Sequence, residues 1–322
     1  MRSLLYIKKS IYRLGTIVIA ALFLLSSSKA YAEEAQYSSR LYTPTFITKI
    51  SGIYFIVDCW NHRIIYSRNM NEPISKWKTL DDDIAGPHSI AGNGTTFIAE
   101  DTGRNRLFVY TLTPKGFKKT QIIDGIAIRP HRTIYDPSNM KFYTLSANSQ
   151  TMYVLKNDKG VISVERKLKL DFQENTYTRS FSIINGEMYF VSGPGKVSVV
   201  NYKDDSFEVI KQYRVPDEYA AMNDIKKLGD FYYITVYPKK IVRLKDLSDF
   251  NKAENIYDVI GFKGTPYYMS YFDGRIFIPE IDSNSGIKSF VLRANEIKDV
   301  KTLNDSGPPN DAVIQRSKEI AT

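Results

Sequence analysis

Cysteine, histidine and tryptophan are scarce in this sequence of 322 residues, which contains one, three and two of them. A single cysteine excludes a disulfide-stapled scaffold and any zinc or iron–sulfur site built from several cysteines. Three histidines leave little room for a histidine-rich metal centre. The lone Cys59 is expected to be buried and unreactive.

Long hydrophobic runs are also missing. The main apolar run, Leu14–Leu25, has 12 residues, whereas a membrane-spanning helix needs roughly 20. It follows a basic segment and precedes Ala30–Ala32, which fits a cleavage site with small residues at its ends. Residues 1–32 therefore predict a secretory signal peptide, with an uncleaved N-terminal anchor as the alternative. We expect a mature monomer without a stable membrane span, exported to the periplasm or secreted to the extracellular space.

A strong excess of one charge is absent once this segment is set aside. The net charge of +9 includes five basic and no acidic residues from positions 1–32, which leaves +4 for the rest. Basic pairs are spread along the chain rather than gathered in one place. This pattern does not favour nucleic acid as a partner. Hydrophobic residues make up 43% of the chain, which is enough for a packed core.

The sequence does contain an internal repeat of about 43 residues. Its units begin near residues 44, 87, 130, 179, 222 and 266. In each unit, short runs of β-branched and aromatic residues alternate with turn residues, which is typical of strands joined by tight turns. The pattern predicts an all-β, TolB-like six-bladed β-propeller over residues 33–303, with four antiparallel strands per blade. Residues 304–322 form a C-terminal tail, and Gln36–Leu41 is one candidate for the strand that closes the ring.

Two segments share a finer pattern. Tyr54–Ile64 and Phe97–Leu107 each contain an apolar strand that ends in Asp, a short turn, and then Arg before an aliphatic strand. These segments resemble the NHL repeat family, and the resemblance implies a six-bladed propeller. It covers the first two units. The other four units have a different residue where the Asp would stand, namely Ser146, Gly193, Val236 and Glu280.

The resemblance implies structural roles for the residues of this motif. The turn carboxylates of Asp58 and Asp101 are expected to accept backbone N–H groups and to pair with Arg63 and Arg106. His62, in the turn of the first unit, is expected to be structural as well.

Alignment of the units places one residue from each at a mouth of the central channel. Concave funnels of this kind are common ligand sites. The rim residues and their neighbours therefore form a predicted ligand site: His88, His131, Arg132, Arg179, Asn223, Asp224, Tyr267 and Tyr268. The arginines favour a ligand with an anionic group. The tyrosines favour a sugar or peptide on which they stack.

Two of the three histidines, His88 and His131, take equivalent positions in consecutive units. With Asp224 they are candidate ligands of a divalent metal such as Zn or Ca. Two similar families of six-bladed propeller enzymes, the peptidyl-hydroxyglycine lyases and the regucalcin-like lactonases, hold a catalytic metal in this way. Contact with a ligand without a metal, and a purely structural role, are the other two interpretations of these histidines.

The sequence leaves three functional hypotheses. The first is a non-catalytic exported propeller that binds a small molecule, glycan, peptide or partner protein at its channel mouth. The second is a metal-dependent lyase or lactonase, in which Asp224 is a third ligand or base and Arg132 or Arg179 holds the substrate. The third is a scaffold of the cell envelope whose channel mouth is plugged by side chains. No catalytic residue is assigned.

Overall fold

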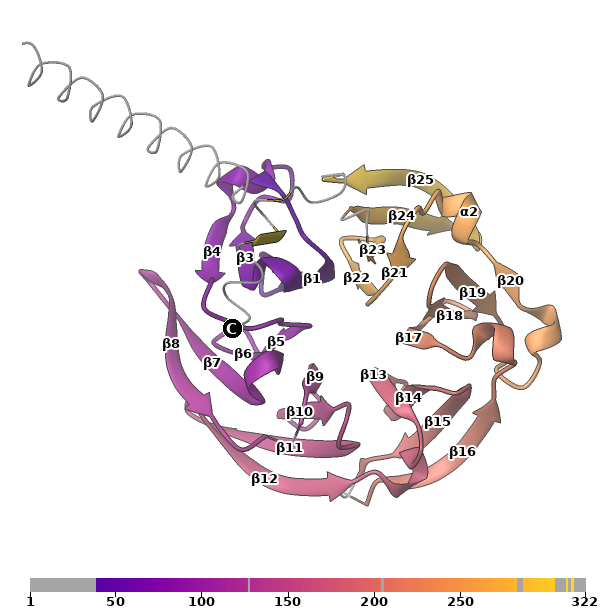
Figure 1. Ribbon diagram of the computed structural model, residues 1–322, viewed down its shortest axis with the longest axis horizontal. Coiled ribbons are helices and arrows are strands. Elements are labelled where there is room, and N and C mark those ends of the chain that lie inside the picture. Colours follow the sequence, from indigo (N-terminus) through magenta and orange to yellow (C-terminus); the bar gives the residue numbers. More distant parts are fainter. Residues whose placement is uncertain are drawn as a thin grey trace, which may run out of the picture.

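The computed structural model describes residues 39–126, 128–203, 206–282 and 286–304, and the single positions 311, 314 and 315. The predicted signal peptide and most of the predicted tail lie outside these residues. Within the described part, strands form six sheets arranged around a central axis, which confirms the six-bladed β-propeller (Figure 1). No helix in this part is both long and apolar enough to cross a membrane.

Each blade is built from consecutive strands of the chain, the first innermost (Figure 1). Blades 1 and 2 contain β1 (Pro44–Ile50), β2 (Ile53–Asp58), β3 (Arg63–Ser67), β4 (Lys78–Asp81), β5 (Ile90–Gly92), β6 (Thr96–Asp101), β7 (Arg106–Thr113) and β8 (Gly116–Ile123). Blades 3 and 4 contain β9 (Pro130–Asp136), β10 (Lys141–Ser146), β11 (Thr151–Asp158), β12 (Val161–Lys169), β13 (Tyr177–Ile184), β14 (Glu187–Gly193), β15 (Lys196–Asn201) and β16 (Glu208–Arg214). Blades 5 and 6 contain β17 (Met222–Leu228), β18 (Phe231–Val236), β19 (Lys240–Leu244), β20 (Glu254–Asn255), β21 (Thr265–Pro266), β22 (Ser270–Phe272), β23 (Arg275–Ile281), β24 (Ile287–Arg293) and β25 (Glu296–Leu303).

Short helices occupy several turns between these strands. They are η1 (Cys59–Asn61), η2 (Ile74–Lys76), η3 (Thr102–Arg104), η4 (Asp171–Gln173), η6 (Asp217–Tyr219), η7 (Phe250–Lys252) and α2 (Tyr257–Ile260). The turns η1 and η3 are equivalent, since each follows the second strand of its blade. Both end at a residue with positive φ, His62 in blade 1 and Asn105 in blade 2.

The hydrophobic core is divided among the interfaces between neighbouring blades. Successive side chains of a strand point to opposite faces of its sheet. Phe55 of β2 therefore packs toward blade 2 with Phe97, whereas the next residue, Ile56, packs toward blade 6 with Phe277. Because both faces are covered, β2 is apolar along most of its length instead of alternating. The outermost strands are partly solvated, and seven of the nine residues of β12 are exposed.

The ring closes without an exchanged strand in the described part of the chain. The sheet of blade 6 contains only β21–β25, and Ser39–Leu41 lies in no strand. Blades 1 and 6 are instead joined by contacts between their side chains. Asp273 accepts hydrogen bonds from Lys49 Nζ at 2.6 Å and from the Tyr54 hydroxyl at 2.8 Å.

Candidate functional site

The inner edges of the blades are tied together by side chains of the neighbouring blade. An innermost strand has unpaired backbone groups along its inner edge. Thr45 Oγ1 donates to the carbonyl of His88 at 3.0 Å, which joins blade 1 to blade 2. Ser89 Oγ accepts the N–H of Thr133 at 3.0 Å, which joins blade 2 to blade 3. Contacts at and beside the predicted rim residue His88 thus help to hold the ring together.

Asp224 belongs to this ring of blade-to-blade contacts. It is fully buried, and its two carboxylate oxygens accept hydrogen bonds from Ser180 Oγ at 2.8 Å and from the Met269 N–H at 2.9 Å. Its neighbour Asn223 donates to the carbonyl of Pro266 at 2.8 Å. Neither side chain lines the pocket described below.

Arg132 and Tyr268 fill the channel beneath its mouth. The guanidinium of Arg132 lies between the rings of Phe46 and Tyr268, 4.3 and 4.4 Å from their centroids, and is almost completely buried. Such cation–π contacts stabilise a desolvated guanidinium. The Tyr268 hydroxyl lies 2.6 Å from His131 Nδ1 and 2.9 Å from the carbonyl oxygen of Arg179. The channel is therefore plugged at this level.

Above this plug lies a pocket of about 770 Å³ at the channel mouth. Among the described residues that line it are four of those predicted for the rim, His88, His131, Arg179 and Tyr267. It also contains residues that the rim alignment missed, above all Trp60, Arg104, Arg129 and Tyr177. Its volume is within the usual range for small-molecule sites. Most of its wall comes from blades 1 to 3, so the pocket sits off the propeller axis.

The charged groups that line this channel-mouth pocket are all basic. Arg104, Arg129 and Arg179 line it, and the described lining residues include no Asp or Glu. Arg104 is neutralised by Asp83 at 2.9 Å and by Asp101 at 3.4 Å. Arg179 donates to the uncharged amide of Asn223. Within the described part of the chain, neither Arg179 nor Arg129 pairs with a carboxylate. The pocket therefore has an uncompensated positive potential, which favours anions.

Arg129 is held in a strained backbone conformation. Its φ is +65°, a region that costs about 1–2 kcal/mol for residues other than glycine. The two equivalent residues, Thr43 and Gly86, also have positive φ values and also line the pocket, and each of the three precedes a proline. Strain of this kind often accompanies function. Here it places a guanidinium at the pocket wall.

His88 and His131 stack face to face at the pocket floor, with ring centroids 3.9 Å apart and planes inclined by 23°. Burial, together with the positive charges of Arg129 and Arg179, lowers the pKa of His88 to about 3. Burial and the neighbouring His88 lower the pKa of His131 well below its ordinary value as well. Both rings are therefore neutral at pH 7. His88 Nδ1 is buried and has no hydrogen-bond partner among the described residues.

The two rings stack on their faces. The lone pairs of imidazole lie in the ring plane, and the two planes are close to parallel. Within the described residues, no group of three or more His, Cys, Asp or Glu side chains is placed to share a metal ion. Cys59 lines the same pocket and is buried, as expected, and burial raises the pKa of its thiol to about 12. It is therefore a neutral thiol at pH 7.

Stability is expected to fall when these histidines must take up protons. The pKa of an unfolded histidine is about 6.5, and that of folded His88 is about 3. Between these values the unfolded chain binds more protons, so the free energy of unfolding decreases as the pH falls. At pH 4.5 His88 alone contributes about 2–3 kcal/mol of this loss. Urea denaturation of the wild type and His88→Gln at pH 7 and 4.5 measures it, and an equal loss in both proteins would contradict the assignment.

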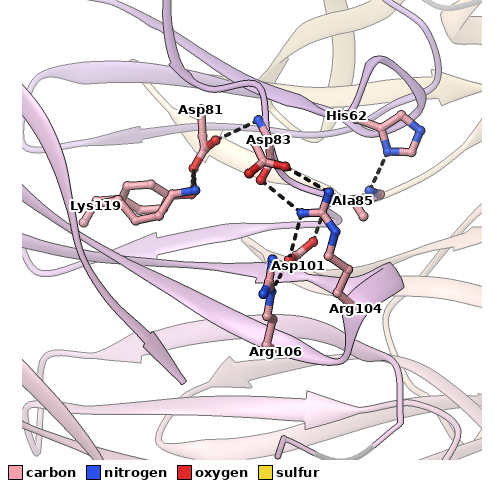
Figure 2. Close-up of polar contacts among 10 residues, drawn as sticks. His62, Asp81, Asp83, Ala85, Asp101, Arg104, Arg106 and Lys119 are labelled. Atoms are coloured by element: carbon pink, nitrogen blue, oxygen red, sulfur yellow. Dashed lines mark hydrogen bonds and ion pairs between the residues drawn. The ribbon is translucent and has the colours of Figure 1, made fainter. Parts of the chain in front are cut away.

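The Asp and Arg residues of the two NHL-like segments are structural, as expected. In blade 1, Asp58 accepts the Tyr42 N–H at 2.7 Å and pairs with Arg63 Nε at 2.8 Å. In blade 2, Asp101 accepts the Ala85 N–H at 2.6 Å and pairs with Arg106 at 2.6 Å. Figure 2 shows Asp101 facing its arginine partners. Each carboxylate fixes the segment that enters its blade.

His62 is structural too, because its Nδ1 accepts the N–H of Gly86 at 3.0 Å and so ties blade 1 to blade 2 (Figure 2). Two residues that replace the Asp in later blades keep part of its function. Ser146 donates to the carbonyl of Ile128 at 2.6 Å. Glu280 accepts the N–H of Lys263 at 3.1 Å. Both residues thus contact the segment that enters their blade, although Ser146 does so as a donor.

The fold is shared with solved structures. A protein described as a putative 6-phosphogluconolactonase from Bacteroides uniformis has a TM-score of 0.57 at 15% identity, with 83% of this chain and 86% of that chain covered. A streptogramin B lyase structure has a TM-score of 0.57 at 14% identity, with 84% of each chain covered. A protein from Lactobacillus plantarum has a TM-score of 0.54 at 11% identity, with 81% of each covered.

No family model matches this sequence, and no curated protein matches it. The NHL assignment of blades 1 and 2 therefore stays a prediction. At identities of 11–15% the structural likeness shows the propeller fold alone.

Proposed function

We propose that this chain is a non-catalytic, exported binding protein whose channel-mouth pocket takes a small ligand with an anionic group. The observation that carries the proposal is the pocket of about 770 Å³. Among the described residues, its lining includes three arginines, two of them without a carboxylate partner, and no Asp or Glu. A guanidinium binds carboxylate or phosphate through directed, charge-assisted hydrogen bonds. The plug of Arg132 and Tyr268 supports a ligand pocket with a closed floor rather than an open channel.

The wider parts of the proposal rest on the sequence. Residues 1–32 support export to the periplasm or the cell exterior. The Asp58–Arg63 and Asp101–Arg106 pairs support an NHL-like origin for the first two blades. A small molecule, a glycan, a peptide or a loop of an envelope protein could supply the anionic group, and the pocket volume favours the small molecule or a sugar.

The proposal is tested by thermal unfolding in citrate or inorganic phosphate, each compared with chloride at equal ionic strength. Citrate at 10 mM is expected to raise the melting temperature by about 2–4 °C, as for a site with a Kd near 1 mM. These anions also stabilise proteins in general by exclusion from the surface. The relevant quantity is therefore the part of the increase that is lost when Arg129 and Arg179 are both replaced. If the double variant shows the same increase as the wild type, the proposal is contradicted.

A metal-dependent lyase or lactonase is the second candidate. It is favoured by the two neutral histidines, His88 and His131, on the floor of an arginine-lined pocket. Proteins with this fold include two described as putative 6-phosphogluconolactonases and a streptogramin B lyase. Elemental analysis of the purified protein discriminates between the candidates. Zinc or calcium near one equivalent, lost in His88→Ala/His131→Ala, would favour the enzyme and lead to lactone and lyase assays.

A further inference from the structure

Trp60 is presented to the solvent at the edge of the channel-mouth pocket. Its side chain lines the pocket and is 48% exposed. An indole so exposed gains less from folding than a buried one, because about half of its area stays in contact with water. Its position is nevertheless well defined. The backbone N–H of Trp60 donates to the carbonyl of Tyr42 at 3.1 Å. The backbone N–H of the preceding Cys59 donates to the carbonyl of Thr43 at 3.3 Å.

The indole is also supported from the side. The rings of Tyr42 and His62 lie 6.3 and 6.4 Å from it, the latter edge-on. His62 is itself fixed by the N–H of Gly86. Trp60 is therefore a supported flat surface at the pocket wall, of the kind on which a ring of a ligand can stack.

Exposed hydrogen-bonding groups line the same pocket. Asn105 and Asn148 are both exposed and both line the pocket. Asn105 Oδ1 accepts the N–H of Arg129 at 2.8 Å, which leaves its amide N–H groups for a ligand. Arg129 adds an uncompensated positive charge beside them. A flat apolar surface, amide groups and a guanidinium are thus combined in one pocket.

We infer that the ligand of this pocket is an acidic sugar, bound with one face of its ring on Trp60. The inference rests on the proposed function and specifies its ligand class. A pyranose has an apolar C–H face for the indole, hydroxyl groups for Asn105 and Asn148, and an acid group for Arg129. An aromatic acid would leave the amides without partners. A simple anion would leave the indole exposed. A carboxylate and a phosphate satisfy Arg129 equally, so uronic acids and sugar phosphates are the two sources of this chemistry.

Intrinsic fluorescence gives a direct test, because the chain has only two tryptophans. Trp77 is buried, and its Nε1 donates to the carbonyl of Glu72. A ligand-induced change in emission therefore reports on Trp60. Glucuronate, glucose 6-phosphate, glucose and citrate are titrated into the full chain. We expect at least one of the two acidic sugars to change the emission and to bind about tenfold more tightly than glucose and citrate. Comparison of these two distinguishes carboxylate from phosphate.

Variants separate stacking from general stability. Isothermal titration calorimetry gives the affinities of the variants, because they lack the Trp60 fluorophore. Trp60→Ala is expected to weaken binding of the acidic sugar about tenfold, and Trp60→Phe, which keeps a flat ring, only about threefold. Tyr271→Ala is the matched control, since Tyr271 is 59% exposed and does not line the pocket. It should leave the affinity unchanged.

The outcomes distinguish this inference from the proposed function. If citrate binds as tightly as the better acidic sugar, or if Trp60→Ala keeps wild-type affinity for that sugar, the inference is overturned and the anion pocket stands. If none of the four compounds binds to the wild type, both fail. If glucose binds as tightly as its acidic derivatives, the pocket recognises the neutral part of the sugar, and the predicted role of the arginines is wrong.

Discussion

Arg63→Met is expected to lower the free energy of unfolding by about 3–5 kcal/mol. Arg63 and Asp58 are buried, with side chains 3% and 0% exposed, and Arg63 Nε lies 2.8 Å from the carboxylate. Methionine fills a similar volume but leaves the carboxylate of Asp58 buried without its cation. The large expected effect comes from this uncompensated charge rather than from the worth of the ion pair itself.

Blade 2 provides a matched control for this prediction. The equivalent Arg106 is 24% exposed, and its partner Asp101 has a second guanidinium, Arg104, at 3.4 Å. Arg106→Met should therefore cost only about 1 kcal/mol. Urea denaturation of both variants measures the difference. Adding Asp58→Asn to Arg63→Met should recover part of the loss, because the buried charge is then removed. Equal losses at Arg63 and Arg106 would show that the motif does not act through buried charge.

Replacement of both pocket arginines, as Arg129→Gly/Arg179→Ala, is expected to weaken the binding of citrate by about 100-fold or more. Each guanidinium without a carboxylate partner should contribute about 1.5–3 kcal/mol to an anionic ligand, and each single variant should lose about tenfold. Isothermal titration calorimetry gives the affinities. Arg104→Ala is the control, because Asp83 and Asp101 already neutralise Arg104, and its effect should stay within about threefold.

The effect of Arg129→Gly on the free energy of unfolding distinguishes a binding residue from a structural one. Glycine adopts the positive φ of this position without strain, as Gly86 does at the equivalent position of blade 2. The free energy of unfolding should therefore stay the same or rise by up to about 1 kcal/mol, while binding is lost. A clear loss of stability would assign Arg129 to the structure of blade 3 instead.

The fold could be predicted because its information is local and repeated. The turns, the strand period of two and the spacing of about 43 residues specify a blade that cannot cover its own two faces. Six such units must therefore stack on one another. The pairing of Phe55 with Phe97 across one interface, and of Ile56 with Phe277 across another, follows from that alternation.

The candidate site was predicted only in part, for a physical reason that lies in the strand starts. The alignment of the units predicted where along the inner strand a residue lies, but not the direction of its side chain. The register shifts at the same place in four blades, at Thr45, His131, Arg179 and Asn223. Such a shift changes which face the following side chains point to. Because the shift is shared, neighbouring side chains decide the rest: His131 and Arg179 line the pocket, whereas Asn223 at the equivalent position donates to the next blade. The adjacent Asp224 also binds the next blade, and Arg132 plugs the channel.

Composition and spacing by themselves determined the six blades and a face rich in polar groups, and the resemblance of two segments to the NHL family implied the structural role of the Asp58 and Asp101 turns. Only the tertiary structure decided which of those groups form a pocket. Arg129 takes the position in its unit that Thr43 and Gly86 take in theirs. Nothing in the local sequence shows that it has a positive φ and places an unpaired charge at the pocket. Trp60 likewise lies in a turn whose contact with Tyr42, far from it in the sequence, exists only once blade 1 has folded. A ligand site depends on side-chain directions from several blades, and those directions are set by packing against neighbouring side chains, not by periodicity.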